Sequence, residues 1–276
     1  MTDHPLRTAL LRGRRRPRRS GAGSPTRSRG DGYEFVEVRE YVAGDDPRRI
    51  DWASTARSGG LQTRVILEDV ALTFAAILDD SPSMRVGRRA ELRSSGLDAV
   101  RAWYGAAATD DRCVRLDARQ AFSPVGLRGQ RAAAACAESP TATGFSLPES
   151  LAIARAALQR GAALLVVADA YDVGDDDAAL VQTAAYCDAT LLLARDPWRA
   201  DLPLRGLTRV ADAETGQSHL LYFGSRQRAA YASAVARREA ALLERFERAG
   251  WRTGLLDERD GAGSLYAAFG LGFHAA

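Results

Sequence analysis

Lysine is missing from this sequence of 276 residues, so each of its 38 basic residues is an arginine, which we interpret as a bias of genome composition. Cysteine is scarce: Cys113, Cys136 and Cys187 lie far apart and form no CxxC pair, which argues against a zinc knuckle or a disulfide framework. No run of 18 apolar residues occurs, so we expect no membrane-spanning helix. Because residues 1–20 contain no long apolar segment, they do not form a secretory signal, and a cytoplasmic location is expected.

Histidine is equally scarce, and this bears on catalysis. His4 lies near the N-terminus, His219 in a predicted hairpin strand and His274 at the C-terminus. A serine or cysteine nucleophile needs a base within hydrogen-bond reach, and none of these histidines suggests such a pair. We therefore expect that the protein is not an enzyme.

Positive charge is concentrated at the start of the chain. Residues 1–30 hold nine arginines and one acid, Asp3, although the whole chain has a net charge of only +3. An arginine-rich leader containing Gly, Ser and Pro predicts a disordered tail. Such a tail could contact nucleic acid or anionic lipid through charge, but no helix-turn-helix, zinc-finger or RNA-binding motif supports nucleic-acid binding. The simpler interpretation is a solvated tail that joins or docks on the domain.

Residues 31–68 form a second segment, which is rich in paired charges. Its pattern predicts a short extended stretch, one or two helical turns over 50–57 and a strand over 61–67. This is a short irregular and β segment that precedes the main domain, which we place at residues 69–276.

Arginine and carboxylate side chains alternate in that segment. Since the arginine fork matches a carboxylate, we expect Asp45, Asp51 and Arg57 to lie in ion pairs. We also expect Tyr41 and Trp52 to pack the segment onto the main domain.

Buried-strand patterns dominate residues 69–276. Apolar runs over 72–78, 162–168 and 189–194 are separated by stretches with helical periodicity. This alternation predicts an α/β fold with a doubly wound, mostly parallel sheet and right-handed crossovers. The other expected helices span 87–104, 127–138, 147–160, 176–186, 225–249 and 263–269, and the other expected strands span 111–116, 120–125, 209–223 (a hairpin) and 251–256.

Polar side chains follow two of the apolar runs. Asp79, Ser81 and Ser83 alternate directly after the first run, and Asp169 and Asp172 follow the second. The carboxyl ends of parallel strands meet at one edge of a doubly wound sheet, where ligands bind. Carboxylate and hydroxyl oxygens suit a hard cation such as Mg²⁺, with Mn²⁺ or Ca²⁺ as alternatives. An ordinary Asp/Ser/Pro turn after a strand is the simpler interpretation of the first group.

The loop before the helix at 147–160 is a weaker source of ligands. It offers the hydroxyls of Thr143 and Ser146 to the same edge of the sheet. With Asp172, these are the secondary candidates for the metal site.

Two stretches resemble known protein families. Asp79-Asp80-Ser81-Pro82-Ser83 resembles the metal-ion-dependent adhesion site of von Willebrand factor A domains. The stretch 39–57 resembles the signature of one bacterial branch of that superfamily, called domain of unknown function 58. Asp196-Pro197, Leu202-Pro203 and the stretch 212–216 (DAETG) are also similar to that branch. The signature positions are Arg39, Tyr41, Gly44, Asp45, Arg49, Asp51, Trp52 and Arg57.

The resemblance implies a von Willebrand factor A-like, Rossmann-type fold with a metal site. In that pattern Ser81 and Ser83 contact the metal directly, and Asp79 and Asp169 act directly or through water. The pattern also has a threonine in the middle loop, where this sequence has Phe145. Losing one of about six ligands weakens binding of a cation with strict octahedral demands, so a degenerate site is the alternative.

The resemblance also implies a function. Members of the family are often encoded beside MoxR-type AAA+ ATPases and are thought to act with them in chaperone-like assembly or maturation of other proteins. We therefore expect a cytoplasmic protein-interaction module with a Mg²⁺ adhesion site and an AAA+ partner. The alternatives are a metal-dependent hydrolase or phosphatase that uses Asp79, and a nucleic-acid binder that uses the arginine-rich tail. Dehalogenase-like phosphatases need a second Asp two residues after the first, where this chain has Ser81.

Overall fold

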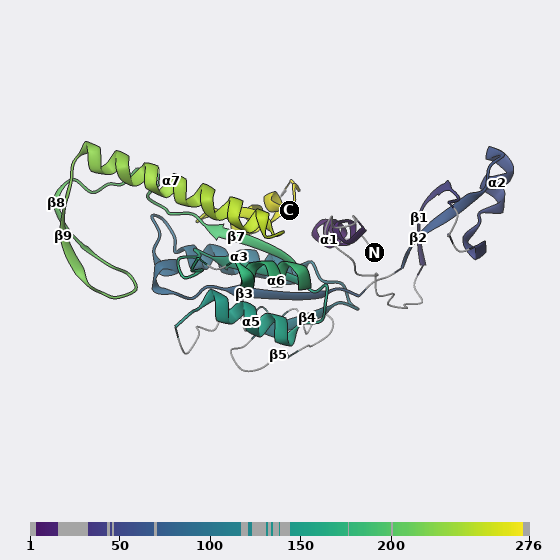
Figure 1. The fold of residues 1–276 in the computed structure, drawn as a ribbon, viewed down its shortest axis with the longest axis horizontal. Helices are drawn as coiled ribbons and strands as arrows, with labels where there is room; N and C mark the ends of the chain where they lie inside the picture. Colours follow the sequence, from purple (N-terminus) through teal and green to yellow (C-terminus); the bar gives the residue numbers. More distant parts are fainter. Residues whose placement is uncertain are drawn as a thin grey trace. The chain divides into compact units, whose positions relative to one another are not determined.

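The computed structural model describes residues 4–15, 33–42, 45, 47–68, 71–116, 121–122, 131, 134, 138, 144–175, 177–199 and 201–272. The chain divides into two compact units (Figure 1). Met1–Pro17 and Leu72–Ala276 form the first, which we call the sheet unit, and Arg18–Ala71 form the second, the signature unit. Each is described by itself.

A six-stranded sheet forms the centre of the sheet unit, in the order β10-β7-β6-β3-β4-β5. Its first five strands in that order run parallel, and β5 pairs antiparallel with β4 at one edge. Counted from β3 as the first strand, this is the order of a doubly wound fold, which changes direction between β3 and β6. The predicted α/β class with a mostly parallel sheet is confirmed. The strands are β3 (Thr73–Leu78), β4 (Arg112–Leu116), β5 (Ala121–Phe122), β6 (Ala163–Ala168), β7 (Asp188–Ala194) and β10 (Arg252–Leu256).

Helices cover both faces of the sheet. One apolar layer joins it to α1 (Pro5–Arg15), α3 (Leu92–Gly105) and α8 (Gly261–Ala268). The other joins it to α5 (Leu147–Ala157), α6 (Ala178–Tyr186) and the C-terminal turns of α7 (Ser225–Arg248).

The central strand β3 is buried on both sides. Phe74 and Ala76 face the layer of α1, α3 and α8, while Ala75 and Ile77 face the other layer. A strand covered on both faces needs apolar side chains at consecutive positions, which explains the unbroken apolar run in the sequence.

Helix α1 corrects one prediction. A disordered tail is predicted over residues 1–30, but Pro5–Arg15 form a helix in which Leu6 and Leu10 are fully buried. The two leucines lie four residues apart and form one apolar face of a helix. The prediction is wrong for this segment because the arginine-rich composition outweighs this short apolar pattern.

A buried ion pair fixes α1 to the sheet unit. Arg7 donates from Nε to Asp111 Oδ2 at 2.8 Å and from Nη2 to Oδ1 at 3.2 Å. The same carboxylate accepts the backbone N–H groups of Leu72 and Ala108. Asp111 therefore ties α1 to the start of β3 and the turn before β4.

The helix predicted over 87–104 begins later than expected. A short 3-10 helix, η2 (Pro82–Arg85), follows β3, and α3 starts at Leu92. Between them the backbone N–H groups of Arg88 and Arg89 donate to the Glu258 carboxylate, so this loop is bound to the segment after β10 instead of continuing a helix. The helix predicted over 127–138 lies largely outside the described residues.

An antiparallel hairpin precedes α7. It consists of β8 (Gly206–Ala211) and β9 (Ser218–Phe223), as the pattern over 209–223 predicts. Figure 1 shows it at the N-terminal end of α7, where it extends beyond the sheet. No residue of either strand is buried. Among the helices that the structure describes, none has the length and apolar character needed to cross a membrane.

The signature unit is small and mainly extended. Strands β1 (Tyr33–Glu40) and β2 (Gln62–Glu68) pair antiparallel, with the 3-10 helix η1 (Pro47–Arg49) and α2 (Trp52–Ser58) between them in sequence. Gly59 ends α2 with a φ of 74°, a value that favours glycine. The predicted strand, helical turns and extended stretch are confirmed.

Candidate functional site

Two strand ends meet where the sheet changes its winding direction. Strands β3 and β6 are neighbours, and the Asp79 backbone N–H donates to Val167 O at 2.9 Å. Helix α3, which follows β3, and helix α6, which follows β6, pack on opposite faces of the sheet. Residues directly after both strands therefore border one crevice, as expected at a switch point. We call Asp79, Ser81, Ser83 and Asp169 the strand-end cluster.

Asp79 is the most deeply buried member, with 1 % of its surface exposed. Its Oδ1 accepts the Ser81 backbone N–H at 2.8 Å. Burial raises the pKa of Asp79 to about 6, the negative charge of Asp169 adds to this, and hydrogen bonds from Ser81 oppose it. A carboxylate in this state is stabilised by a nearby cation. The neighbouring Asp80 is paired with Arg93, whose Nε lies 2.5 Å from Oδ1.

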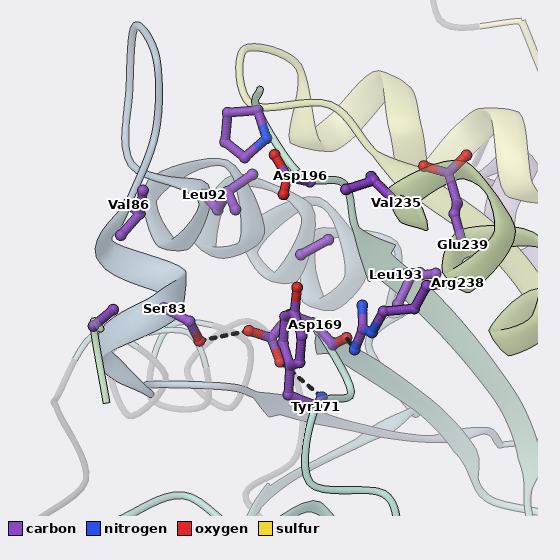
Figure 2. A pocket seen from close by; sticks show the side chains of 13 residues that line it. Ser83, Val86, Leu92, Asp169, Tyr171, Leu193, Asp196, Val235, Arg238 and Glu239 are labelled. Atoms are coloured by element: carbon purple, nitrogen blue, oxygen red, sulfur yellow. Dashed lines mark hydrogen bonds between the residues drawn. The ribbon is translucent and has the colours of Figure 1, made fainter. Parts of the chain in front are cut away.

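The two serine hydroxyls lead from Ser81, whose backbone N–H binds Asp79, to the Asp169 carboxylate. Ser81 Oγ lies 2.9 Å from Ser83 Oγ, and Ser83 Oγ donates to Asp169 Oδ2 at 2.5 Å. Figure 2 shows the second of these bonds. All four residues predicted as principal metal ligands are thus brought together.

A strained turn positions Asp169. Its Oδ1 accepts the Tyr171 N–H at 3.0 Å, and Ala170 between them has a φ of 54°, which residues other than glycine rarely adopt. Such strain is concentrated at functional sites. Burial raises the pKa of Asp169, while the hydrogen bond from Ser83 lowers it.

Arg238 of α7 lies against the same turn. It donates from Nη2 to the backbone oxygen of Asp169 at 2.9 Å, and its guanidinium carbon is 3.5 Å from the centroid of the Tyr171 ring. Stacking of this kind is a cation–π contact. Local sequence patterns do not indicate that Arg238 reaches the strand-end cluster.

A pocket of about 160 Å³ opens beside the cluster (Figure 2). Its walls are partly apolar and partly charged, and they come from the segments after β3 and β6, from the end of β7 and the segments after it, and from α3 and α7. The lining residues are Ser83, Val86, Leu92, Asp169, Tyr171, Leu193, Ala194, Asp196, Pro197, Ala213, Val235, Arg238 and Glu239. The pocket has room for a partner side chain or for ordered water.

Glu214 is a second residue of the site that the local patterns miss. Its Oε1 accepts the backbone N–H of Ser83 at 3.0 Å, across 131 positions of sequence. The only sequence signal for it is the stretch 212–216, which resembles the family.

The weaker candidates have other roles or lie elsewhere. Asp172 Oδ2 accepts the Leu147 N–H at 2.6 Å and so binds the start of α5, and Ser146 is the N-cap residue of that helix. Phe145, at the position of the missing threonine, packs against the apolar core and provides no oxygen. Thr143 lies outside the described residues.

The donor chemistry of the cluster fits a hard cation. Two carboxylates and two hydroxyls are oxygen donors, and Mg²⁺ takes one or two carboxylates while keeping several waters. In the part of the chain that the structure describes, no three His, Cys, Asp or Glu side chains form a metal-binding group. Binding here would therefore depend on Ser81, Ser83 and water, and the metal stays a prediction.

Several signature residues form a local network in their own unit. Arg39 donates to Asp45 Oδ1 at 2.7 Å, and the Val42 backbone N–H and the Arg39 guanidinium hold the pKa of Asp45 below its usual value. The predicted ion pair of Asp45 is present. Tyr41 donates from its hydroxyl to the Asp45 backbone oxygen at 3.4 Å.

The remaining signature residues surround α2. Asp51 caps the helix by accepting the Ser54 N–H at 2.9 Å, and Arg57 donates to the Ser54 hydroxyl at 3.3 Å. Trp52, predicted to be packed, is 68 % exposed. Arg49 lies in η1, and Gly44 is outside the described residues. Packing of this unit on the sheet unit stays a prediction.

Comparison with known proteins identifies the family. Among solved structures, a von Willebrand factor type A protein from Catenulispora acidiphila is similar, with 13% sequence identity and a TM-score of 0.38; the match covers 76% of this chain and 43% of that one. This chain therefore spans less than half of that chain's length. No curated protein matches. The family described as "Protein of unknown function DUF58" matches residues 37–241, which include the signature residues and the strand-end cluster, and the chain belongs to this family.

Proposed function

We propose that this chain is a protein-interaction module that binds Mg²⁺ at the strand-end cluster and, through it, an acidic side chain of a partner protein. The observation that supports this most directly is the chain of hydrogen bonds that starts at Asp79, which accepts the Ser81 backbone N–H, and continues through the Ser81 and Ser83 hydroxyls to Asp169. Asp79, Ser81, Ser83 and Asp169 would hold the ion. Bound Mg²⁺ supplies a site for a carboxylate oxygen, because hard cations prefer oxygen ligands.

The cluster also explains why the partner group would be acidic. Asp79 and Asp169 place two carboxylates in a largely buried site, so the cation compensates their charge there. Arg238 adds a positive side chain at the wall of the adjacent pocket. A carboxylate entering this pocket would meet both positive charges. Of the acidic residues that also line the pocket, Glu239 is paired with Arg195.

The protonation of Cys113 and the positions of His4 and His219 favour binding over catalysis. Burial raises the pKa of Cys113 to about 12, so this thiol is not ionised at neutral pH. His4 Nε2 lies 3.1 Å from the Tyr266 hydroxyl, and His219 lies in the exposed hairpin. The competing proposal is a phosphatase or hydrolase using Asp79. Turnover of phosphate or ester substrates that is lost in Asp79→Asn would favour that enzyme.

Calorimetric titration of Mg²⁺ into chelator-stripped protein tests the metal site. We expect saturable binding to the wild type and a loss of at least about tenfold in affinity in Ser83→Ala, because a direct oxygen ligand is removed. Ser94→Ala, which changes an exposed serine of α3, is the matched control and should bind as the wild type does. Absence of binding heat in the wild type would contradict the proposal.

We further propose a cytoplasmic AAA+ ATPase of the MoxR type as the partner, on the basis of the family resemblance. Pull-downs from cells with the full chain as bait should recover such an ATPase in Mg²⁺. EDTA or Ser83→Ala should reduce the recovery. If neither condition recovers an AAA+ protein, this choice of partner is wrong.

A further inference from the structure

Strand β8 carries its most exposed side chains on one face of the hairpin. Leu207, Arg209 and Ala211 alternate with less exposed residues, so their side chains lie on the same side of the sheet. The residues of β9 directly opposite Leu207 and Arg209 are Tyr222 and Leu220. Leu207, Leu220 and Tyr222 are each more than half exposed. Large apolar side chains that adjoin one another at a surface are typical of an interaction site.

The hairpin also has a free strand edge. In the part of the chain that the structure describes, β8 pairs with β9 and no third strand joins this sheet. Strand β9 leads directly into α7 and contacts it, and Arg228 of α7 donates to Phe223 O at 3.5 Å. The β8 side is therefore the freer of the two edges. Such an edge presents backbone N–H and C=O groups with which another extended segment can pair.

Hydrogen bonds in the turn hold the hairpin in one arrangement. Asp212 Oδ1 accepts the backbone N–H groups of Glu214 and Thr215, both at 2.8 Å. Glu214 Oε1 in turn accepts the Ser83 backbone N–H at 3.0 Å, which joins the turn to the segment after β3. A partner thus meets β8 as an ordered strand, and this lowers the entropy that is lost on binding.

Positive charge determines which partner fits this edge. Arg209 lies two positions from Leu207 on the exposed face, and neither β8 nor β9 contains an acidic residue. Arg205 and Arg226, which flank the hairpin, are exposed as well. Side chains directly opposite each other on paired strands interact. A segment that pairs with β8 therefore fits best with an apolar side chain opposite Leu207 and a carboxylate opposite Arg209.

Two other occupants fit this edge less well. A second copy of the chain would bring two Arg209 side chains to neighbouring positions, where like charges are unfavourable. A lipid surface can accept leucine, tyrosine and arginine, but its hydrocarbon cannot pair with the free backbone groups of β8. An extended segment of another protein provides both the backbone partners and the carboxylate.

We propose that the edge of β8 binds an extended, acidic and apolar segment of a partner protein, which pairs with β8 as an added strand. The backbone hydrogen bonds supply affinity, and the positions opposite Leu207 and Arg209 supply specificity. This docking surface is distinct from the strand-end cluster and needs no metal ion.

A heptapeptide of alternating residues, Thr-Leu-Thr-Glu-Thr-Leu-Thr, is the probe. Its sequence reads the same in both directions, so leucine and glutamate share one face whichever way the strand runs. With a dansyl label and in EDTA, fluorescence anisotropy should show saturable binding to the full chain with a Kd below about 1 mM. Leu207→Ser should weaken binding at least about tenfold. Val181→Ser, which changes an exposed valine of α6, is the matched control and should bind as the wild type does.

An exchange of charge tests the role of Arg209. Arg209→Glu should bind the glutamate peptide at least about tenfold more weakly than the wild type does. A second peptide with lysine in place of glutamate should bind this variant more tightly than it binds the wild type. A merely structural effect of the substitution would weaken the binding of both peptides.

Four results would overturn this inference. They are no saturable binding of the glutamate peptide to the wild type, equal binding to the wild type and Leu207→Ser, equal binding of both peptides to the wild type, and a dimer in sedimentation that Leu207→Ser converts to a monomer. Pelleting with phosphatidylserine vesicles that Leu207→Ser abolishes would assign the face to a membrane instead. Because the peptides are titrated in EDTA, these results leave the proposed Mg²⁺ site untouched.

Discussion

At the residue scale, Asp79 combines deep burial with an ionisable group. Its pKa of about 6 lies above the ordinary value of 3.8, so the folded protein binds a proton there that the unfolded chain releases. The free energy of unfolding therefore falls as the pH rises from about 4 to about 6. Above this window the charged carboxylate destabilises the metal-free fold, which is the cost that a bound cation would offset.

Asp79→Asn removes this titration while keeping an oxygen for the Ser81 N–H. In EDTA at pH 7 we expect the variant to be more stable than the wild type by about 1 to 3 kcal/mol, with the difference disappearing at pH 4. Urea denaturation at both pH values measures it. A variant that is less stable at pH 7 would show that the charged form of Asp79 is favoured in the fold.

Mg²⁺ should stabilise the wild type more at pH 7.5 than at pH 5. The cation requires ionised carboxylates, and both Asp79 and Asp169 have raised pKa values. Thermal denaturation with and without saturating Mg²⁺ gives the shift in Tm at each pH. Ser83→Ala should show little shift at either pH. A Mg²⁺ effect of the same size in this variant would place the ion elsewhere.

At the element scale, α1 is an integral part of the sheet unit. Arg7→Ala should lower the free energy of unfolding by about 3 kcal/mol, because it leaves the buried Asp111 carboxylate without its cation. Arg12→Ala changes an exposed arginine of the same helix and should alter stability by less than about 0.5 kcal/mol. Equal urea midpoints for the two variants would mean that α1 does not dock through this pair.

The contact between α3 and α8 depends on a glycine. A Cβ atom added to Gly261 would lie 1.8 Å from Ser95 O, so Gly261→Ala forces the two helices apart. We expect a loss of about 1 to 3 kcal/mol in the free energy of unfolding. Gly105→Ala, at the end of α3 where the added atom meets open space, is the control and should be nearly neutral. Similar stability of both variants in urea would show that the helices can separate without cost.

At the scale of the whole molecule, sequence patterns predict the parts of the structure that depend on local periodicity. The apolar runs of β3, β6 and β7 predict the sheet, and the polar residues after the first two predict the strand-end cluster. Both follow from the rule that parallel strands are buried on both faces and bind ligands at their carboxyl ends.

Long-range contacts could not be predicted in the same way. The contact between Glu214 and Ser83 joins residues 131 positions apart, and α1 is held by a pair between residues 104 positions apart. Asp172 shows the reverse case: its position after β6 suggests a metal ligand, but it binds the start of α5. Several polar residues can follow a strand, and the backbone turn there decides which of them enters the site. The residue types alone do not specify that turn.

Binding of a divalent cation at the strand-end cluster is best tested with crystals grown in Mn²⁺, because this ion has an anomalous scattering signal. We expect one anomalous peak within coordination distance of the Ser81 and Ser83 hydroxyls, beside Asp169. No peak at that position in saturating Mn²⁺ would contradict it.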